Sequence, residues 1–146
     1  MSQPIYQYPH VEIDLGKLKE NLAALQERCQ ASSIEITGIV KGFSALPPAV
    51  KVYEEVGMHS VGSSRMDQLR RLREAGITAQ LMLIRIPMPC EVEEVVRWSD
   101  ISLESEIAVL RALNQAAERA GKRHKVILMV DLGDLREGFW DLSLIH

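Results

Sequence analysis

The plan of the fold is clearest in VILMVDLGDLREG, residues 126–138. Val126 to Val130 form an unbroken apolar run, which is typical of a strand buried on both faces of a parallel sheet. The run ends at Asp131, and a loop rich in charge and glycine follows it. Ligands of parallel α/β folds bind at the carboxyl ends of strands. The stretch therefore predicts a buried strand and, directly after it, a candidate site.

The same alternation of an apolar strand and an amphipathic helix extends back through the chain. Apolar residues between the strands recur at spacings of three and four, as in amphipathic helices. An alternating segment, residues 11–15, predicts one more strand at the start, and Asp14 is placed to cap the next helix. This order predicts an α/β fold with a parallel sheet, either an open doubly wound sheet or part of a βα barrel. The other predicted strands cover residues 34–40, 59–62, 80–86 and 101–103.

Length and composition exclude several classes of protein. The 146 residues suffice for one domain, whereas a complete eight-stranded βα barrel typically needs ~250 residues. The 47% hydrophobic and 25% charged content is that of a soluble globular protein. A net charge of −3 argues against nucleic acid as a partner. No apolar run approaches the ~20 residues of a membrane span, and the first residues lack a signal-peptide pattern. We therefore expect a cytoplasmic protein with no membrane partner.

Lys41 is a candidate for covalent chemistry because it follows the predicted strand 34–40 and precedes Gly42. Partial desolvation at a strand end lowers the pKa of a lysine. A neutral amine forms a Schiff base with an aldehyde such as pyridoxal phosphate. The alternative is a solvated lysine that marks where the strand meets water.

Three further side chains stand at predicted strand ends. Arg136 is suited to donate to a phenolate or carboxylate oxygen, and Asp131 and Arg85 each end or closely follow a strand. The alternative for the loop of residues 131–138 is an ordinary polar turn. Residues 63–65 suit either an anion site at a helix N-terminus or a simple helix cap.

Other polar residues predict no site. The histidines and the two cysteines lack metal-ligand spacing, so we expect no metal. One predicted helix mixes both signs of charge, which is typical of a solvated face rather than a nucleic-acid patch. Its charged residues are Arg65, Asp67, Arg70, Arg71, Arg73 and Glu74.

Taken together, several segments resemble the N-terminal barrel domain of the alanine racemase family, the fold-type III pyridoxal-phosphate enzymes. The stretch 127–138 is the most specific and is similar to the ornithine racemase branch. The resemblance covers about residues 9–140. It implies a partial TIM (β/α) barrel with about five of the eight strands, in which strand 11–15 packs outside and Lys41 ends the first barrel strand. The other segments are residues 11–15, Asn21, Val40-Lys41, Ser64-Arg65, residues 83–87, residues 100–103 and Ser105-Glu106.

The resemblance also implies a reaction. Lys41 would bind pyridoxal 5'-phosphate as a Schiff base and serve as one of two acid/base groups at the α-carbon of a small-molecule amino acid. Arg136, in the frame Asp-x-Gly-x-x-Arg-x-Gly, would donate a hydrogen bond to the phenolic oxygen of the cofactor, with Asp131 beside it. Arg85 falls at the mouth of another strand without a family role. The implied activity is an isomerase, a racemase of ornithine or a related amino acid.

The chain departs from the family pattern in two places. Ala45 stands where alanine racemases carry a tyrosine that contacts the phosphate, and residues 141–146 drift away from the pattern. We expect residues 1–146 to be an incomplete N-terminal part of the barrel domain, inactive alone and homo-oligomeric in its full-length form. Two alternatives remain open: a pyridoxal-phosphate-binding protein without catalysis, involved in cofactor homeostasis, and a pseudo-enzyme fragment that needs a partner.

Overall fold

Alternating helices and strands make up the part of the chain that the computed structural model describes, residues 9–140. Two short 3-10 turns, η1 and η2, lie between them. In chain order the elements are α1 (Leu15–Gln30), β1 (Thr37–Ile39), η1 (Lys41–Phe43), α2 (Pro47–Glu55), β2 (Ser60–Ser63), α3 (Met66–Glu74), β3 (Gln80–Leu83), η2 (Pro89–Glu91), α4 (Val92–Trp98), β4 (Ile101–Glu104), α5 (Ile107–Ala120) and β5 (Lys125–Leu128).

The sheet identifies which of the two predicted architectures is present. All neighbouring strands are parallel, and their order is β1-β2-β3-β4-β5, the same as their order along the chain. A doubly wound sheet reverses its order at a switch point, whereas consecutive order is that of a βα barrel. The described residues therefore form a five-stranded portion of such a barrel, as the family resemblance implies.

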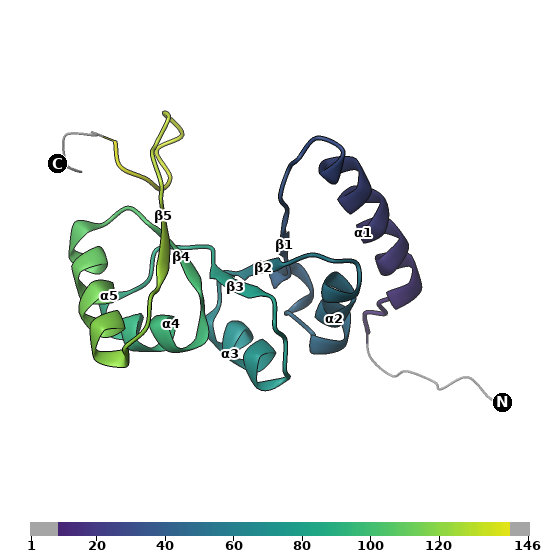
Figure 1. Ribbon diagram of the computed structural model, residues 1–146, viewed down its shortest axis with the longest axis horizontal. Coiled ribbons are helices and arrows are strands. Elements are labelled where there is room, and N and C mark those ends of the chain that lie inside the picture. Colours follow the sequence, from purple (N-terminus) through teal and green to yellow (C-terminus); the bar gives the residue numbers. More distant parts are fainter. Residues whose placement is uncertain (1–8, 141–146) are drawn as a thin grey trace.

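The helices form a single layer. Each of them contacts the next along the chain, from α1 with α2 to α4 with α5. Figure 1 shows this row of helices, with α1 at one end of the molecule and α5 at the other. Right-handed crossovers of one kind produce this arrangement. No helix among residues 9–140 is long and apolar enough to cross a membrane.

The main core lies between the sheet and this helix layer. Val61, Leu81 and Leu83 on the strands are fully buried, together with Leu69 and Leu72 of α3. Apolar side chains at helical spacing thus meet alternate side chains of the strands, which is the packing that the sequence pattern predicts. The outer strand β5 is covered less, since all four of its residues are exposed.

The predicted strand at residues 11–15 is wrong. These residues have no strand partner, and helix α1 already begins at Leu15. Five alternating residues also fit an extended segment leading into a helix, and Asp14 favours that outcome because its Oδ1 accepts the Lys17 amide at 3.0 Å. The predicted Asp14 cap is confirmed.

Other boundaries differ by a few residues. Strands β1, β3 and β5 are shorter than predicted because pairing, rather than apolar character, sets their ends: β1 covers Thr37–Ile39, β3 ends at Leu83, and β5 ends at Leu128. Neither serine of the suggested helix cap at residues 63–65 caps α3. Arg65 and Glu106 occupy the capping positions of α3 and α5, without a capping side-chain hydrogen bond.

Candidate functional site

The candidate residues share one edge of the sheet, where the carboxyl ends of the parallel strands meet. Lys41 follows β1, Arg85 follows β3, and the loop of residues 131–138 follows β5. Because β1 and β5 are the outer strands, Lys41 and Arg136 stand at opposite ends of this edge. No hydrogen bond or ion pair joins Lys41, Arg85 and Arg136 to one another in the structure.

A tight turn carries Lys41. Val40 is fully buried, and its amide donates to the carbonyl of Gly62 on β2 at 3.0 Å. The Ser44 amide donates to the carbonyl of Lys41 at 3.1 Å, and the Ala45 amide donates to that of Val40 at 2.9 Å. The backbone at Lys41 is therefore fixed by the core below it and by the turn that follows.

The Lys41 side chain itself is exposed, and no residue among 9–140 forms a hydrogen bond or ion pair with it. The partial burial that the strand end predicts for this side chain is thus absent in this structure. The reason is the position of β1 at the edge of the sheet, where β2 is its neighbour on one side only. The amine is free to meet a ligand.

The loop of residues 131–138 is closed on itself. The Phe139 amide donates to the carbonyl of Met129 at 2.8 Å, and the Asp131 amide donates to that of Phe139 at 3.1 Å. Gly138 has φ 131°, and a Cβ added there would lie 2.5 Å from the Asp131 nitrogen. Only glycine fits this crossing of the backbone.

Asp131 holds the inside of this loop. Its Oδ1 accepts the Gly133 amide at 2.7 Å and the Leu135 amide at 3.2 Å. The Gly133 and Leu135 amides lower the pKa of this carboxyl, so it is ionised at neutral pH. Arg136 follows, with an exposed side chain that has no hydrogen-bond or ion-pair partner among the described residues. Asp131 therefore shapes the loop, and the guanidinium of Arg136 is left free.

Arg85 differs from Lys41 and Arg136 because its donors are already engaged. Nε donates to the carbonyl of Ser64 at 2.8 Å, and Nη1 donates to that of Ile86 at 3.1 Å. Nη1 and Nη2 also bind the two carboxylate oxygens of Glu91, which in turn accepts the Met88 amide. The hydrogen bonds between the two side chains raise the pKa of Arg85 and lower the pKa of Glu91. Arg85 thus ties the loop after β2 to the loop after β3.

Three polar side chains, Ser102, Glu104 and His124, form a network at β4. Ser102 Oγ donates to Glu104 Oε1 at 2.7 Å and lies 3.0 Å from His124 Nε2. Glu104 is fully buried, and desolvation raises its pKa to about 7. Desolvation also lowers the pKa of His124. Ser102 is in register with the core residue Leu83, so this network lies on the helix side of the sheet. The one sequence signal is a glutamate two residues after a serine in an apolar strand.

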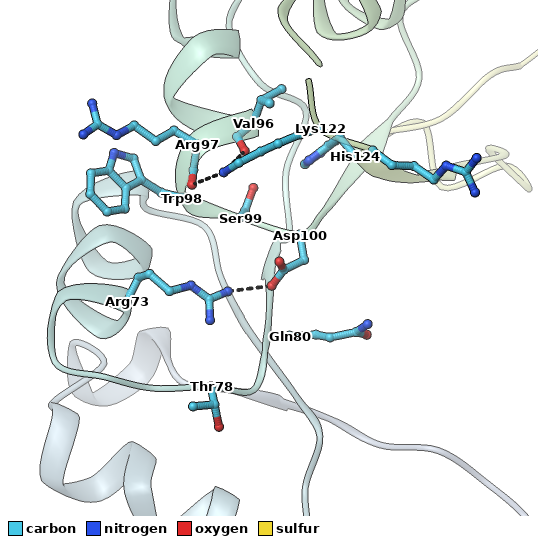
Figure 2. A pocket seen from close by; sticks show the side chains of 11 residues that line it. Arg73, Thr78, Gln80, Val96, Arg97, Trp98, Ser99, Asp100, Lys122 and His124 are labelled. Carbon is cyan, nitrogen blue, oxygen red and sulfur yellow. Dashed lines mark hydrogen bonds and ion pairs between the residues drawn. The ribbon is translucent and has the colours of Figure 1, made fainter. Parts of the chain in front are cut away.

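A pocket of about 520 Å³ lies at the opposite edge of the sheet, before the strands begin. Figure 2 shows Arg73 reaching Asp100, with Arg73 Nη2 2.6 Å from Asp100 Oδ2. Lys122 Nζ donates to the carbonyl of Arg97 at 3.2 Å. These contacts close the ends of α3 and α4 onto the sheet. This face of a βα barrel contributes to stability rather than to catalysis, so we place the candidate site at the carboxyl edge.

Comparison with known proteins finds amino-acid racemases. The sequence is 41% identical over 134 residues to ornithine racemase of Acetoanaerobium sticklandii, covering 92% of this chain and 37% of that protein. It is 32% identical over 133 residues to lysine racemase of Thermotoga maritima, covering 91% of this chain and 38% of that protein. The chain therefore spans less than two fifths of the length of either relative.

The solved structure of alanine racemase from a D-cycloserine-producing Streptomyces lavendulae superposes with a TM-score of 0.75 at 25% identity. The match covers 87% of this chain and 34% of that one. The family described as alanine racemase, N-terminal domain, matches residues 13–145, nearly the whole sequence. The chain belongs to the alanine racemase N-terminal domain family.

Proposed function

We propose that this chain is the cofactor-binding N-terminal part of a pyridoxal-phosphate-dependent amino-acid racemase. The observation that carries the proposal is the pair of unpartnered cationic side chains, Lys41 and Arg136, at the carboxyl edge of the sheet. Enzymes of this family use pyridoxal 5'-phosphate. The donor set fits that cofactor, because a primary amine suits its aldehyde and a guanidinium suits its phenolic oxygen.

Each residue has a defined part in this proposal. Lys41 would hold the cofactor through Nζ and, when released from it, move a proton at the α-carbon of the substrate. Arg136 would donate to the phenolic oxygen from a loop that Asp131 shapes. Bound pyridoxal phosphate supplies an electron sink that lowers the cost of removing the α-proton. Arg85 would support the neighbouring loops. The side chain of Ala45 is buried and has no polar atom, so other groups would have to bind the phosphate.

The names of the relatives point to a substrate class. Ornithine and lysine, which the two relatives racemise by name, are both amino acids with a second, distal amine. We propose an amino acid of this kind as the substrate of the complete enzyme. Since the chain spans 37% of the ornithine racemase length, we also propose that residues 1–146 alone have little or no racemase activity.

A cofactor titration tests the proposal. The purified chain is mixed with pyridoxal phosphate, and the visible absorbance of the bound cofactor is followed as its concentration rises. Lys41→Ala should abolish saturable binding, whereas Lys51→Ala, which removes an exposed lysine of α2, should not. Equal binding by both variants would refute the assignment of Lys41.

A racemisation assay on the same purified chain distinguishes cofactor binding alone from catalysis. Saturable binding without loss of optical activity from L-ornithine is expected for the isolated chain. A complete loss of optical activity at an enzyme-like rate would show that the chain is sufficient for catalysis. The cytoplasmic location and the homo-oligomeric full-length form stay predictions.

A further inference from the structure

The turn after Lys41 contains two successive residues in the left-handed region. Ser44 has φ 57° and ψ 26°, and Ala45 has φ 49°. Residues other than glycine, asparagine and aspartate adopt this region rarely, because Cβ crowds the backbone. Ala45 is also fully buried. The turn therefore needs support from the surrounding structure to keep its shape.

Arg71 supplies a contact from a different part of the chain. Its Nη2 donates a hydrogen bond to the carbonyl of Ser44, 27 residues away in sequence. The helix backbone at Arg71 is held in place because Leu69 and Leu72 of the same turn of α3 are fully buried. The adjacent Arg70 forms a different contact: its Nε lies 3.8 Å from Glu74 Oε1, within the same helix. Two neighbouring arginines thus have separate roles.

We propose that Arg71 is a positioning residue for Lys41. By holding the carbonyl of Ser44, it keeps the left-handed turn in place and thereby fixes the backbone from which the Lys41 amine extends. This inference rests on the proposed function for the role of Lys41. The charge pattern alone predicted a solvated helix face for this arginine, whereas the proposal assigns it a positioning role.

The test compares four variants of the chain: Arg71→Ala, Arg71→Lys, Arg70→Ala and the double variant Arg71→Ala with Ser44→Gly. The first readout is hydrogen exchange at the Ser44 and Ala45 amides, which needs no cofactor. The second is the affinity for pyridoxal phosphate, measured by absorbance. Arg70→Ala is the matched control, because it removes the same charge from the same helix.

Arg71→Ala should speed exchange at both amides and weaken cofactor binding by roughly tenfold or more, the size expected for one charge-assisted hydrogen bond. Arg70→Ala should change neither, and Arg71→Lys should restore part of the loss. Ser44→Gly in the Arg71→Ala background should also restore binding, because glycine adopts positive φ without the Cβ penalty.

Two outcomes would overturn the proposal in distinguishable ways. If the unchanged chain takes up no pyridoxal phosphate at Lys41, both this inference and the proposed function fail. If the unchanged chain binds normally and Arg71→Ala behaves like Arg70→Ala in both readouts, this inference alone fails.

Discussion

At the scale of single residues, the sequence predicts two of the candidate side chains at the carboxyl edge of the sheet. Lys41 and Arg136 stood out because each follows an apolar strand, and the structure leaves both side chains free. The sequence did not predict the contacts of Glu104 and Arg71. Glu104 follows an apolar strand in the sequence but is fully buried in the fold, and Arg71 belongs to a mixed-charge helix. Their roles depend on burial and on contacts across βα units, which no local pattern reports.

The buried Glu104 predicts a pH-dependent stability. Its pKa in the folded chain is about 7, above the ordinary 4.5. Between these values the unfolded chain releases a proton that the folded chain keeps, so the free energy of unfolding falls as pH rises, by roughly 3 kcal/mol at most. Urea denaturation at pH 4.5 and pH 7.5 measures this change, and Glu104→Gln should remove it.

His124 acts in the opposite direction and must be separated from Glu104. Desolvation lowers its pKa, so its contribution to stability is lost as pH falls below its ordinary value of 6.5. Subtracting the pH dependence of the unfolding free energy of Glu104→Gln from that of the unchanged chain gives the contribution of Glu104. The same pH dependence in both proteins would contradict the assignment.

At the scale of elements, the sequence predicted the order of strands and helices, and it predicted the ends of the strands less closely. Helix α5 ends at Ala120, and Gly121 follows as its C-cap with φ 59°, a conformation that glycine adopts without strain. Strands depend on a neighbour for their hydrogen bonds, so an isolated alternating segment such as residues 11–15 is ambiguous. The loops at the carboxyl edge could be located from the sequence, but their internal hydrogen bonds could not.

The closed loop of residues 131–138 predicts a strong effect at Gly138. Gly138→Ala forces a Cβ against the Asp131 backbone at a φ of 131°, so the loop must open and move Arg136. We expect weaker pyridoxal-phosphate binding and a loss of about 1–3 kcal/mol in unfolding free energy. Leu132→Ala is the control, because that side chain is 94% exposed. Equal effects of the two changes would argue against the closed loop.

The Arg85–Glu91 pair predicts that two glutamates near the start of α4 contribute unequally to the free energy of unfolding. Glu91 is partly buried and binds Arg85 with both oxygens, whereas Glu93 pairs with Arg119 in an exposed position. Glu91→Ala should cost about 1–3 kcal/mol of unfolding free energy. Glu93→Ala should cost about 0–1 kcal/mol. Thermal or urea unfolding compares the two, and a larger loss for Glu93→Ala would refute the role given to Arg85.

At the scale of the whole molecule, consecutive strand order identifies a portion of a barrel with two outer strands. The sequence predicted this architecture only with the help of a family resemblance, because an alternation of strands and helices also fits a doubly wound sheet. Strand order is a property of tertiary pairing. Figure 1 shows the consequence, with β5 at one side of the sheet and β1 at the other.

The outer strand β5 predicts self-association. Val126, Ile127 and Leu128 are each 41–44% exposed, and an apolar outer strand offers unpaired backbone groups to another chain. The apparent mass in light scattering should rise with concentration, and Ile127→Lys should reduce that rise. Ile107→Lys on α5 is the control. A chain that stays monomeric at all concentrations would contradict this expectation.

The most direct test of the central claim is to locate the cofactor on the chain. Residues 1–146 are incubated with pyridoxal phosphate, reduced with borohydride and digested, and the modified lysine is identified by mass spectrometry. We predict that the modification saturates at Lys41 and is absent from the other lysines at the same cofactor concentration. Modification spread evenly over the exposed lysines, with no preference for Lys41, would contradict the account.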